Sequence, residues 1–297
     1  MTTPRTLGSA GFGGLDLEQT DYSSSRAVIL PIPYDATTTY RTGSRDGPAA
    51  ILAASANMEL FDEDLKREPC EVGIATLEPV EPDARGPERM VETIVKRCSG
   101  PVSEGKFVVG LGGEHTVTLG LLQPHVQSHP DSLSVLQIDA HADLRNIYQE
   151  SRYSHACVMR RALESCPVVG VGIRSFCREE YKFMKEFGLQ PFSMEIIRGR
   201  EDWIQQVVER LSPKVYLTVD LDGLDPSICP GVGTPEPGGL DWVQVNQLLK
   251  TVFKNRQVVG ADVVECLPVP GQCQSEFLAA RLVYKIIGYR FAEEILK

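Results

Sequence analysis

The sequence predicts an α/β protein whose mostly parallel sheet is covered by helices on both faces. Its apolar runs are continuous rather than alternating, which indicates strands buried on both sides. Stretches with helical spacing separate these runs, and such interleaving is typical of parallel sheets. Acidic and histidine residues follow three of the runs, where parallel sheets bind their ligands. We expect one large domain, because no internal repeat, low-complexity linker or charge block interrupts the pattern.

The expected strands are short and rich in β-branched residues. They cover residues 27–33, 106–112, 134–139, 168–173, 214–220 and 257–265. The expected helices between them include residues 47–58, 86–98, 202–211 and 241–255. Residues 1–26 are rich in Gly, Ser and Thr, and we expect them to form an N-terminal arm, either mobile or in contact with another subunit. Residues 27–297 then form the single domain.

Composition narrows the classes of partner and compartment. The 297 residues are 42% hydrophobic and 24% charged, as in ordinary soluble proteins, and the net charge of −10 argues against nucleic acid or an anionic membrane as partner. The eight cysteines contain no C-x-x-C pair, which favours reduced thiols in the cytosol. The N-terminus has no apolar signal-peptide core, and no apolar run approaches the about 18–20 residues of a membrane span. We expect a cytoplasmic protein.

Residues that favour metal ions gather where three strands end. They are Glu114 and His115 after the second expected strand, Asp139, His141 and Asp143 after the third, and Asp220 and Asp222 after the fifth. Alternate residues of an extended chain share a face, so each set can converge on one point. Taken singly, a histidine here is more often a loop or cap residue, and a D-x-D pair is often turn chemistry. Three ionisable groups on one strand end are costly to bury without a cation or a hydrogen-bond network.

Together these sets favour two metal ions over one. Four aspartates and two histidines are more ligands than one ion needs, whereas two ions can share carboxylates. Carboxylates and imidazoles without thiolates suit Mn²⁺ or a similar ion better than a cysteine-bound zinc. Two ions about 3.5–4 Å apart can bridge one water and lower its pKa. The pattern therefore predicts a hydrolase.

Four segments of the chain resemble signature blocks of the ureohydrolases, the arginase and agmatinase family. They are GGEHTVTLG (112–120), DAHADLR (139–145), YSHACVMRR (153–161) and TVDLDGLDPSICPGVGTPEPGGL (218–240). The similarity extends over roughly residues 27 to 290. It implies an arginase-like three-layer α/β/α fold with a mostly parallel central sheet of about eight strands, and two Mn²⁺ ions per subunit at the strand ends. It also implies a homo-oligomer, a trimer or a hexamer.

The resemblance gives roles to eight residues. The six metal ligands of the family correspond to His115, Asp139, His141, Asp143, Asp220 and Asp222, the same residues that the strand-end argument groups. His155 corresponds to the histidine that transfers protons. Glu265 corresponds to the carboxylate that holds the substrate guanidinium, whose carbon is attacked by a hydroxide that bridges the metals.

The resemblance is strongest to the short bacterial and archaeal agmatinases, which implies hydrolysis of agmatine to putrescine and urea in polyamine biosynthesis. Arg145 stands where arginases carry an asparagine that reads the amino-acid substrate, which counts against arginine. Aminopropylagmatine is a close alternative because it is also a cationic guanidino compound. Guanidinobutyrate requires Arg145 or another basic residue to face the pocket. Arg145 is thus either substrate-binding or structural, pairing with acids at a subunit surface.

Two readings from other classes remain. A mononuclear zinc deacetylase would explain Asp139, His141 and Asp222, but deacetylases use a tandem His-His pair that this chain lacks. A non-catalytic ureohydrolase-like regulator would be expected to have lost metal ligands, and all six are present. A dinucleotide-binding protein is disfavoured because no G-x-G-x-x-G follows any expected strand.

Overall fold

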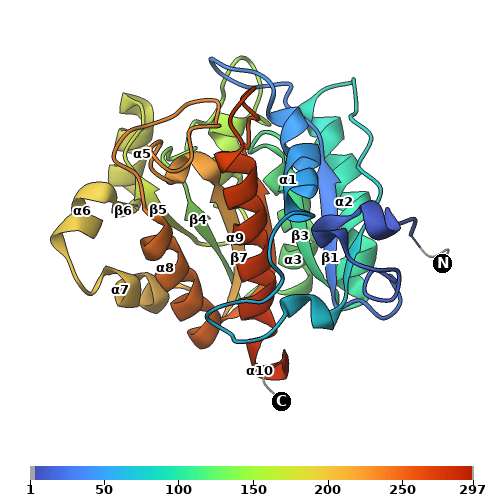
Figure 1. Cartoon of the computed structure of the whole chain (residues 1–297). Helices are drawn as coiled ribbons and strands as arrows, with labels where there is room; N and C mark the ends of the chain where they lie inside the picture. The colour runs from blue at the N-terminus through green and yellow to red at the C-terminus, as the bar shows by residue number, and fades with distance from the viewer. Residues whose placement is uncertain (1–3, 296–297) are drawn as a thin grey trace.

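The protein is built on one sheet of eight strands in the order β2-β1-β3-β8-β7-β4-β5-β6. The computed structural model describes residues 4–295, and every neighbouring pair of strands in it is parallel (Figure 1). The strands are β1 (Ala27–Ile32), β2 (Ile74–Thr76), β3 (Phe107–Gly112), β4 (Leu133–Ile138), β5 (Val168–Ile173), β6 (Phe192–Ser193), β7 (Lys214–Asp220) and β8 (Gln257–Val264). The predicted parallel sheet is confirmed.

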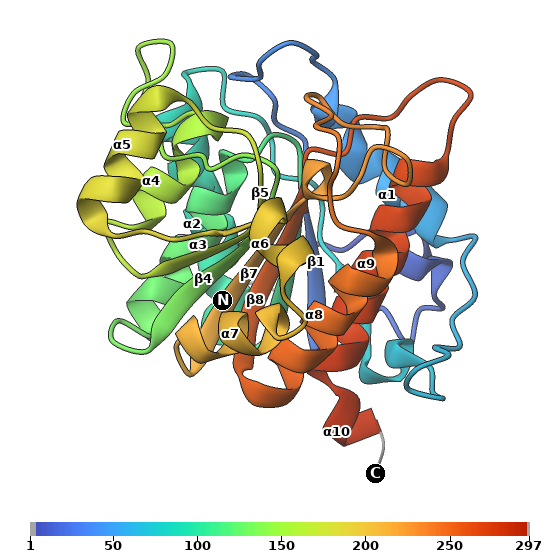
Figure 2. The ribbon, with the colours of Figure 1, turned by 90° about the vertical axis from the view of Figure 1, so that its left-hand side faces the viewer.

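Helices cover both faces of the sheet, as the sequence predicts. In Figure 2 the sheet lies between α2, α3, α4 and α5 on one side and α1, α8 and α9 on the other. The helices are α1 (Gly47–Ser55), α2 (Pro87–Ser103), α3 (Val117–Ser128), α4 (Val158–Ala162), α5 (Arg178–Phe187), α6 (Met194–Gly199), α7 (Trp203–Arg210), α8 (Trp242–Asn255), α9 (Gln274–Arg290) and α10 (Ala292–Ile295). No helix among residues 4–295 is both long and apolar enough to cross a bilayer.

Alternate residues of each strand supply the two cores between these layers. In β1, Val28 packs with the residues of one core and Ile29 with those of the other, and both are fully buried. Because both faces are buried, the strands read as continuous apolar runs. The two strands that the sequence pattern does not indicate, β2 and β6, contain three and two residues and lie at the sheet edges. Runs this short carry no detectable period.

The N-terminal segment predicted as an arm is packed on the domain from its first described residues. It contains two short 3₁₀ helices, η1 (Gly8–Ala10) and η2 (Phe12–Gly14). Phe12 is fully buried, and its N–H donates a 2.8 Å hydrogen bond to Thr76 Oγ1 in β2. The Gly13 N–H donates to Ser55 Oγ in α1. Buried apolar side chains, Phe12 and Leu15 among them, and hydrogen bonds from the backbone therefore hold a stretch whose composition suggested mobility.

The buried histidine of α3, His125, gives the fold a dependence on pH. It is 2% exposed and its ring lies 5.3 Å from that of Tyr216. Burial, followed by the nearby His129, lowers the pKa of His125 to about 4, against about 6.5 in an unfolded chain. The unfolded chain therefore binds more protons between these values, so stability is lost as the pH falls from 6.5 towards 4.

We expect the His125 contribution to the free energy of unfolding to fall by about 2 kcal/mol between pH 7 and pH 5. The variant His125→Phe keeps a ring in place but cannot titrate, so its stability should fall less over this range. Urea denaturation of both proteins at the two pH values measures the difference. Equal losses in both proteins would show that His125 is not the titrating group.

Candidate active site

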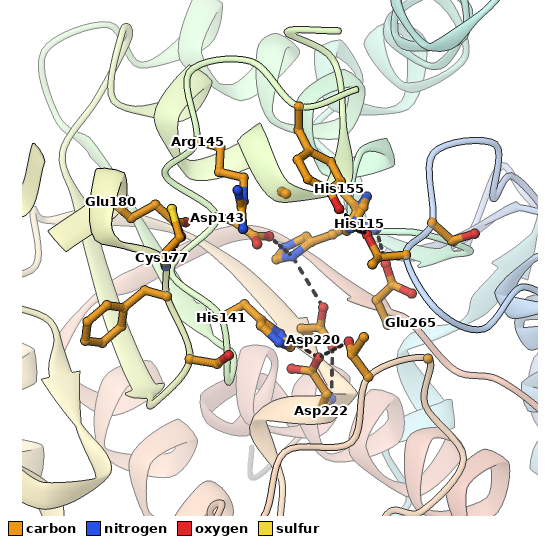
Figure 3. Close-up of a pocket in the computed structure, with 18 of the residues that line it drawn as sticks. His115, His141, Asp143, Arg145, His155, Cys177, Glu180, Asp220, Asp222 and Glu265 are labelled. Carbon is orange, nitrogen blue, oxygen red and sulfur yellow. Dashed lines mark hydrogen bonds and ion pairs between the residues drawn. The ribbon is translucent and has the colours of Figure 1, made fainter. Parts of the chain in front are cut away.

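Four adjacent strands place the candidate residues beside one another. In the order β3-β8-β7-β4, they are followed by His115, Glu265, Asp220 and Asp139 respectively, with Asp220 the last residue of β7. Because all four strands are parallel, their carboxyl ends meet at one edge of the sheet. A cavity of about 310 Å³ opens at this edge. Figure 3 shows the side chains of His115, Asp220 and Glu265 at this cavity.

The six predicted metal ligands form two overlapping donor groups. In the first, His115 Nδ1 lies 3.2 Å from Asp139 Oδ2, 3.0 Å from Asp143 Oδ2 and 3.4 Å from Asp220 Oδ2. In the second, His141 Nδ1 lies 2.9 Å from Asp222 Oδ2 and 3.7 Å from Asp139 Oδ1. Asp139 belongs to both groups. Two ions sharing a carboxylate would occupy these groups.

The backbone that carries Asp139, His141 and Asp143 is not the extended strand that the prediction assumed. β4 ends at Ile138, and Asp143 has a φ of +52°. A left-handed conformation costs an ordinary residue about 1–2 kcal/mol, and such strain concentrates at functional sites. Glu265 shares it, with a φ of +63°. The convergence of the side chains is as predicted, whereas a local bend, and not strand alternation, brings Asp143 to the group.

The D-x-D-G sequence after β7 closes the second donor group. The short 3₁₀ helix η6 (Leu221–Gly223) carries Asp222, whose N–H donates to Asp220 Oδ1 at 2.9 Å. Asp222 Oδ1 in turn accepts a hydrogen bond from the Ala140 N–H at the end of β4. A Cβ at Gly223 would lie 2.7 Å from the backbone nitrogen of Asp139. Glycine therefore permits the close approach of the two ligand-bearing segments.

The donor atoms fit cations. His115 Nδ1 is buried and has no hydrogen-bond partner in the described chain, although three carboxylates face it. Burial and the nearby Asp143 and Asp222 carboxylates raise the pKa of Asp139 to about 7. Carboxylates crowded in this way repel one another unless a cation or protons lie between them. The residues present therefore fit a dinuclear metal centre.

Glu265 is the carboxylate next to the donor groups that belongs to neither of them. Its Oε1 accepts a 2.8 Å hydrogen bond from the His115 N–H, and its Oε2 accepts none from the described residues. The side chain lines the cavity, and burial and Glu114 raise its pKa to about 8. A buried carboxylate with an open oxygen suits a cationic ligand that brings its own N–H donors.

His155 lines the cavity from the short 3₁₀ helix η5 (His155–Cys157). Its ring nitrogen Nε2 lies 3.0 Å from Thr39 Oγ1, and its backbone N–H donates to Thr37 Oγ1 at 3.1 Å. The Thr37 hydroxyl donates to Glu114 Oε1 at 2.7 Å. Burial lowers the pKa of His155, so the ring is neutral and able to exchange a proton. The sequence assigns no role to these two threonines. The feature that could have indicated them is a run of hydroxyl side chains soon after β1.

Two arginines lie in the wall of the cavity. The guanidinium of Arg145 lies 4.8 Å from the centre of the Tyr148 ring. Arg41 also lines the cavity. Within residues 4–295, neither arginine forms an ion pair with a carboxylate. The pairing of Arg145 with acids, one of its two expected roles, does not occur within this part of the chain.

Comparisons with known proteins agree with this geometry. The Arginase family model matches residues 25–288. An N(1)-aminopropylagmatine ureohydrolase of Synechocystis is 40% identical over 91% of this chain and 90% of its own, and one from Thermus thermophilus is 42% identical over 92% and 93%. An agmatinase of Bacillus anthracis is 34% identical over 84% and 86%. The crystal structure of the agmatine ureohydrolase of Thermoplasma volcanium has a TM-score of 0.83 at 33% identity and covers 92% of each chain. The chain therefore belongs to the arginase family of ureohydrolases.

Proposed function

We propose that this enzyme releases urea from the guanidino group of a polyamine precursor. The observation that carries the proposal is the position of Glu265, a cavity carboxylate with an open oxygen beside two donor groups that share Asp139. Aminopropylagmatine is the first candidate, because the two relatives above with 40% and 42% identity bear that name. Agmatine, which the sequence resemblance favours, is the second, supported by the agmatinase at 34% identity.

Glu265 and His155 would divide the work on the substrate. A guanidinium is planar and protonated at neutral pH, so the open Glu265 oxygen would accept its N–H groups and fix its orientation. Bound metal ions would supply an activated water and so make attack on the guanidinium carbon possible near neutral pH. The bond between the guanidinium carbon and the nitrogen that carries the alkyl chain would then break, which yields urea and an alkylamine. His155, partly buried and neutral, would take up the proton that the attacking water loses and pass it to the departing amine.

We further propose that both ions are Mn²⁺. Four carboxylates and two imidazoles without a thiolate suit a hard-to-borderline divalent ion. A cytoplasmic location and a homo-oligomer, trimer or hexamer, remain proposals that come from the sequence and its family resemblance. All eight cysteines are free, which supports the proposed cytoplasmic location.

The wall of the cavity supports a second substrate class, a guanidino acid such as guanidinobutyrate. Arg41 and Arg145 carry positive charges that no carboxylate of the described chain neutralises by ion pairing. A substrate carboxylate would pair with either of them, whereas the ammonium of a polyamine tail would be repelled. A basic residue that faces the pocket is what the sequence required for guanidinobutyrate as the substrate.

A panel of four substrates tests the proposal. Urea release is measured with aminopropylagmatine, agmatine, guanidinobutyrate and arginine, each with Mn²⁺. We expect the highest kcat/KM for aminopropylagmatine or agmatine. Preference for guanidinobutyrate would replace the polyamine assignment with the guanidino-acid one. Preference for arginine, or no urea from any of the four, would contradict the proposed function.

Replacing Arg145 with glutamine should change KM with a sign that depends on the substrate. For a cationic tail, removal of a like charge should lower KM by about two- to tenfold. For guanidinobutyrate, loss of a partner for its carboxylate should raise KM. Arg152→Gln is the matched control, since Arg152 follows on the same loop but is exposed and pairs with Glu164. An unchanged KM for every substrate would show that Arg145 does not contact the tail.

A further inference from the structure

A chain of buried hydrogen bonds runs from the first donor group into the sheet. His115 Nε2 lies 2.9 Å from Thr218 Oγ1 in β7. The Thr218 hydroxyl donates to Asp262 Oδ1 in β8 at 2.6 Å, and the Tyr216 hydroxyl donates to Asp262 Oδ2 at 2.7 Å. The register of the sheet pairs Thr218 directly with Asp262. All four residues are at most 1% exposed, so these bonds are shielded from bulk water.

The direction of each bond follows from the number of protons available. A threonine hydroxyl has one proton, and an ionised carboxylate can only accept. The proton of Thr218 therefore goes to Asp262, because its other neighbour, Thr118 Oγ1, lies 3.4 Å away. The Thr218 oxygen must then accept from His115, which places a proton on His115 Nε2. That tautomer leaves Nδ1 bare, and Nδ1 is the atom that faces the three carboxylates.

Apart from its hydrogen bonds to Thr218 and Tyr216, no role is evident for Asp262. It does not line the cavity, and no cation of the described chain pairs with it. Burying a carboxylate supported only by hydroxyl donors is costly, and an apolar residue would avoid that cost. The hydrogen bond to Thr218 explains why the carboxylate is buried here. A histidine that binds a metal depends on a hydrogen-bond partner for its second ring nitrogen, and Asp262 orients the Thr218 hydroxyl that serves as this partner.

We propose that Asp262 is a positioning residue that acts through Thr218 to hold His115 in the tautomer whose Nδ1 binds a metal ion. This inference rests on the proposed function, because it presumes that the two donor groups are metal sites. It goes further in predicting that the two sites can be separated. Loss of the hydrogen bond between Thr218 and His115 should lower the affinity of the His115 group for its metal ion by about 10–100-fold, as loss of such a partner commonly does. The ion of the His141 group should be retained.

Three variants test the proposal by equilibrium dialysis against graded Mn²⁺. Thr218→Val removes the hydroxyl at nearly constant volume, and Thr218→Ser restores it. Tyr216→Phe disturbs the same buried carboxylate without touching the contact with His115, and so controls for a general structural effect. The melting temperature of each metal-free variant is recorded beside its metal content.

We expect the wild type, T218S and Y216F to bind two Mn²⁺ ions with similar affinities, and T218V to bind one normally and the other at least about tenfold more weakly. Y216F should lower the melting temperature without loss of metal. Binding of both ions by T218V with wild-type affinity would overturn the proposal, as would equal weakening in T218V and Y216F. A wild type that binds fewer than two ions contradicts the proposed function itself, so the two failures are distinguishable.

A measurement on the unaltered protein covers the case in which T218V does not fold. In zinc-loaded wild-type protein labelled with ¹⁵N-histidine, NMR should show a proton on His115 Nε2 and a metal-shifted Nδ1. A metal-bound, unprotonated Nε2 would overturn the proposal.

Discussion

Replacing Asp139 with asparagine should lower kcat/KM for urea release by at least about 1,000-fold, because removal of bound metal ions costs several kcal/mol of transition-state stabilisation. Asp139 is the residue shared by the two donor groups and is fully buried between them. An amide supplies no charge to offset either cation. Metal content, measured by elemental analysis, should fall together with activity.

The matched control for this variant is Asp62→Asn. Asp62 is also a fully buried aspartate, but it pairs with Lys285 and does not line the cavity. Its replacement should lower stability while both metals and the activity are kept. If Asp139→Asn retained two ions and wild-type turnover, the shared-ligand account of the site would be wrong.

Replacing Glu265 with glutamine should lower kcat/KM by about 100- to 1,000-fold and leave the metal content at two ions. Truncating one partner of a buried charge pair costs about 2–5 kcal/mol, and the new amide would direct N–H donors at a guanidinium that offers only donors. Glu265 belongs to neither donor group, so metal binding should survive. The two measurements together therefore separate substrate binding from metal binding. A change in kcat/KM below about threefold would rule out Glu265 as the guanidinium partner.

The strand ends could be predicted because two strong signals coincide there. Val135, Leu136 and Ile138 are fully buried apolar residues on both faces of β4, and three ionisable residues follow this strand closely. A parallel sheet places all such ends at one edge, where the ends of neighbouring strands meet. That these ends share one edge could be predicted, whereas the meeting of His115 with Asp139 and Asp220 also required that β3, β8, β7 and β4 be adjacent, which the sequence pattern does not give.

Other features depend on contacts that no local pattern encodes. The left-handed backbone of Asp143 could not be predicted, because aspartate adopts this conformation only occasionally and nothing local marks this position. Thr37 meets His155 across 118 positions of sequence, and Asp262 meets Thr218 across 44. The tight packing of Phe12 likewise depends on Thr76, a residue of a strand too short to predict. Separations of this size carry no periodicity, so only the folded chain reveals these partners.

The central claim is that guanidino hydrolysis here requires two metal ions held by six residues. The most direct measurement is a titration of Mn²⁺ into chelator-treated protein, with urea release from aminopropylagmatine and agmatine followed at each step. We expect activity to be absent without metal and to reach its plateau at two equivalents per chain. A plateau at one equivalent, or undiminished activity in the chelated protein, would contradict the claim.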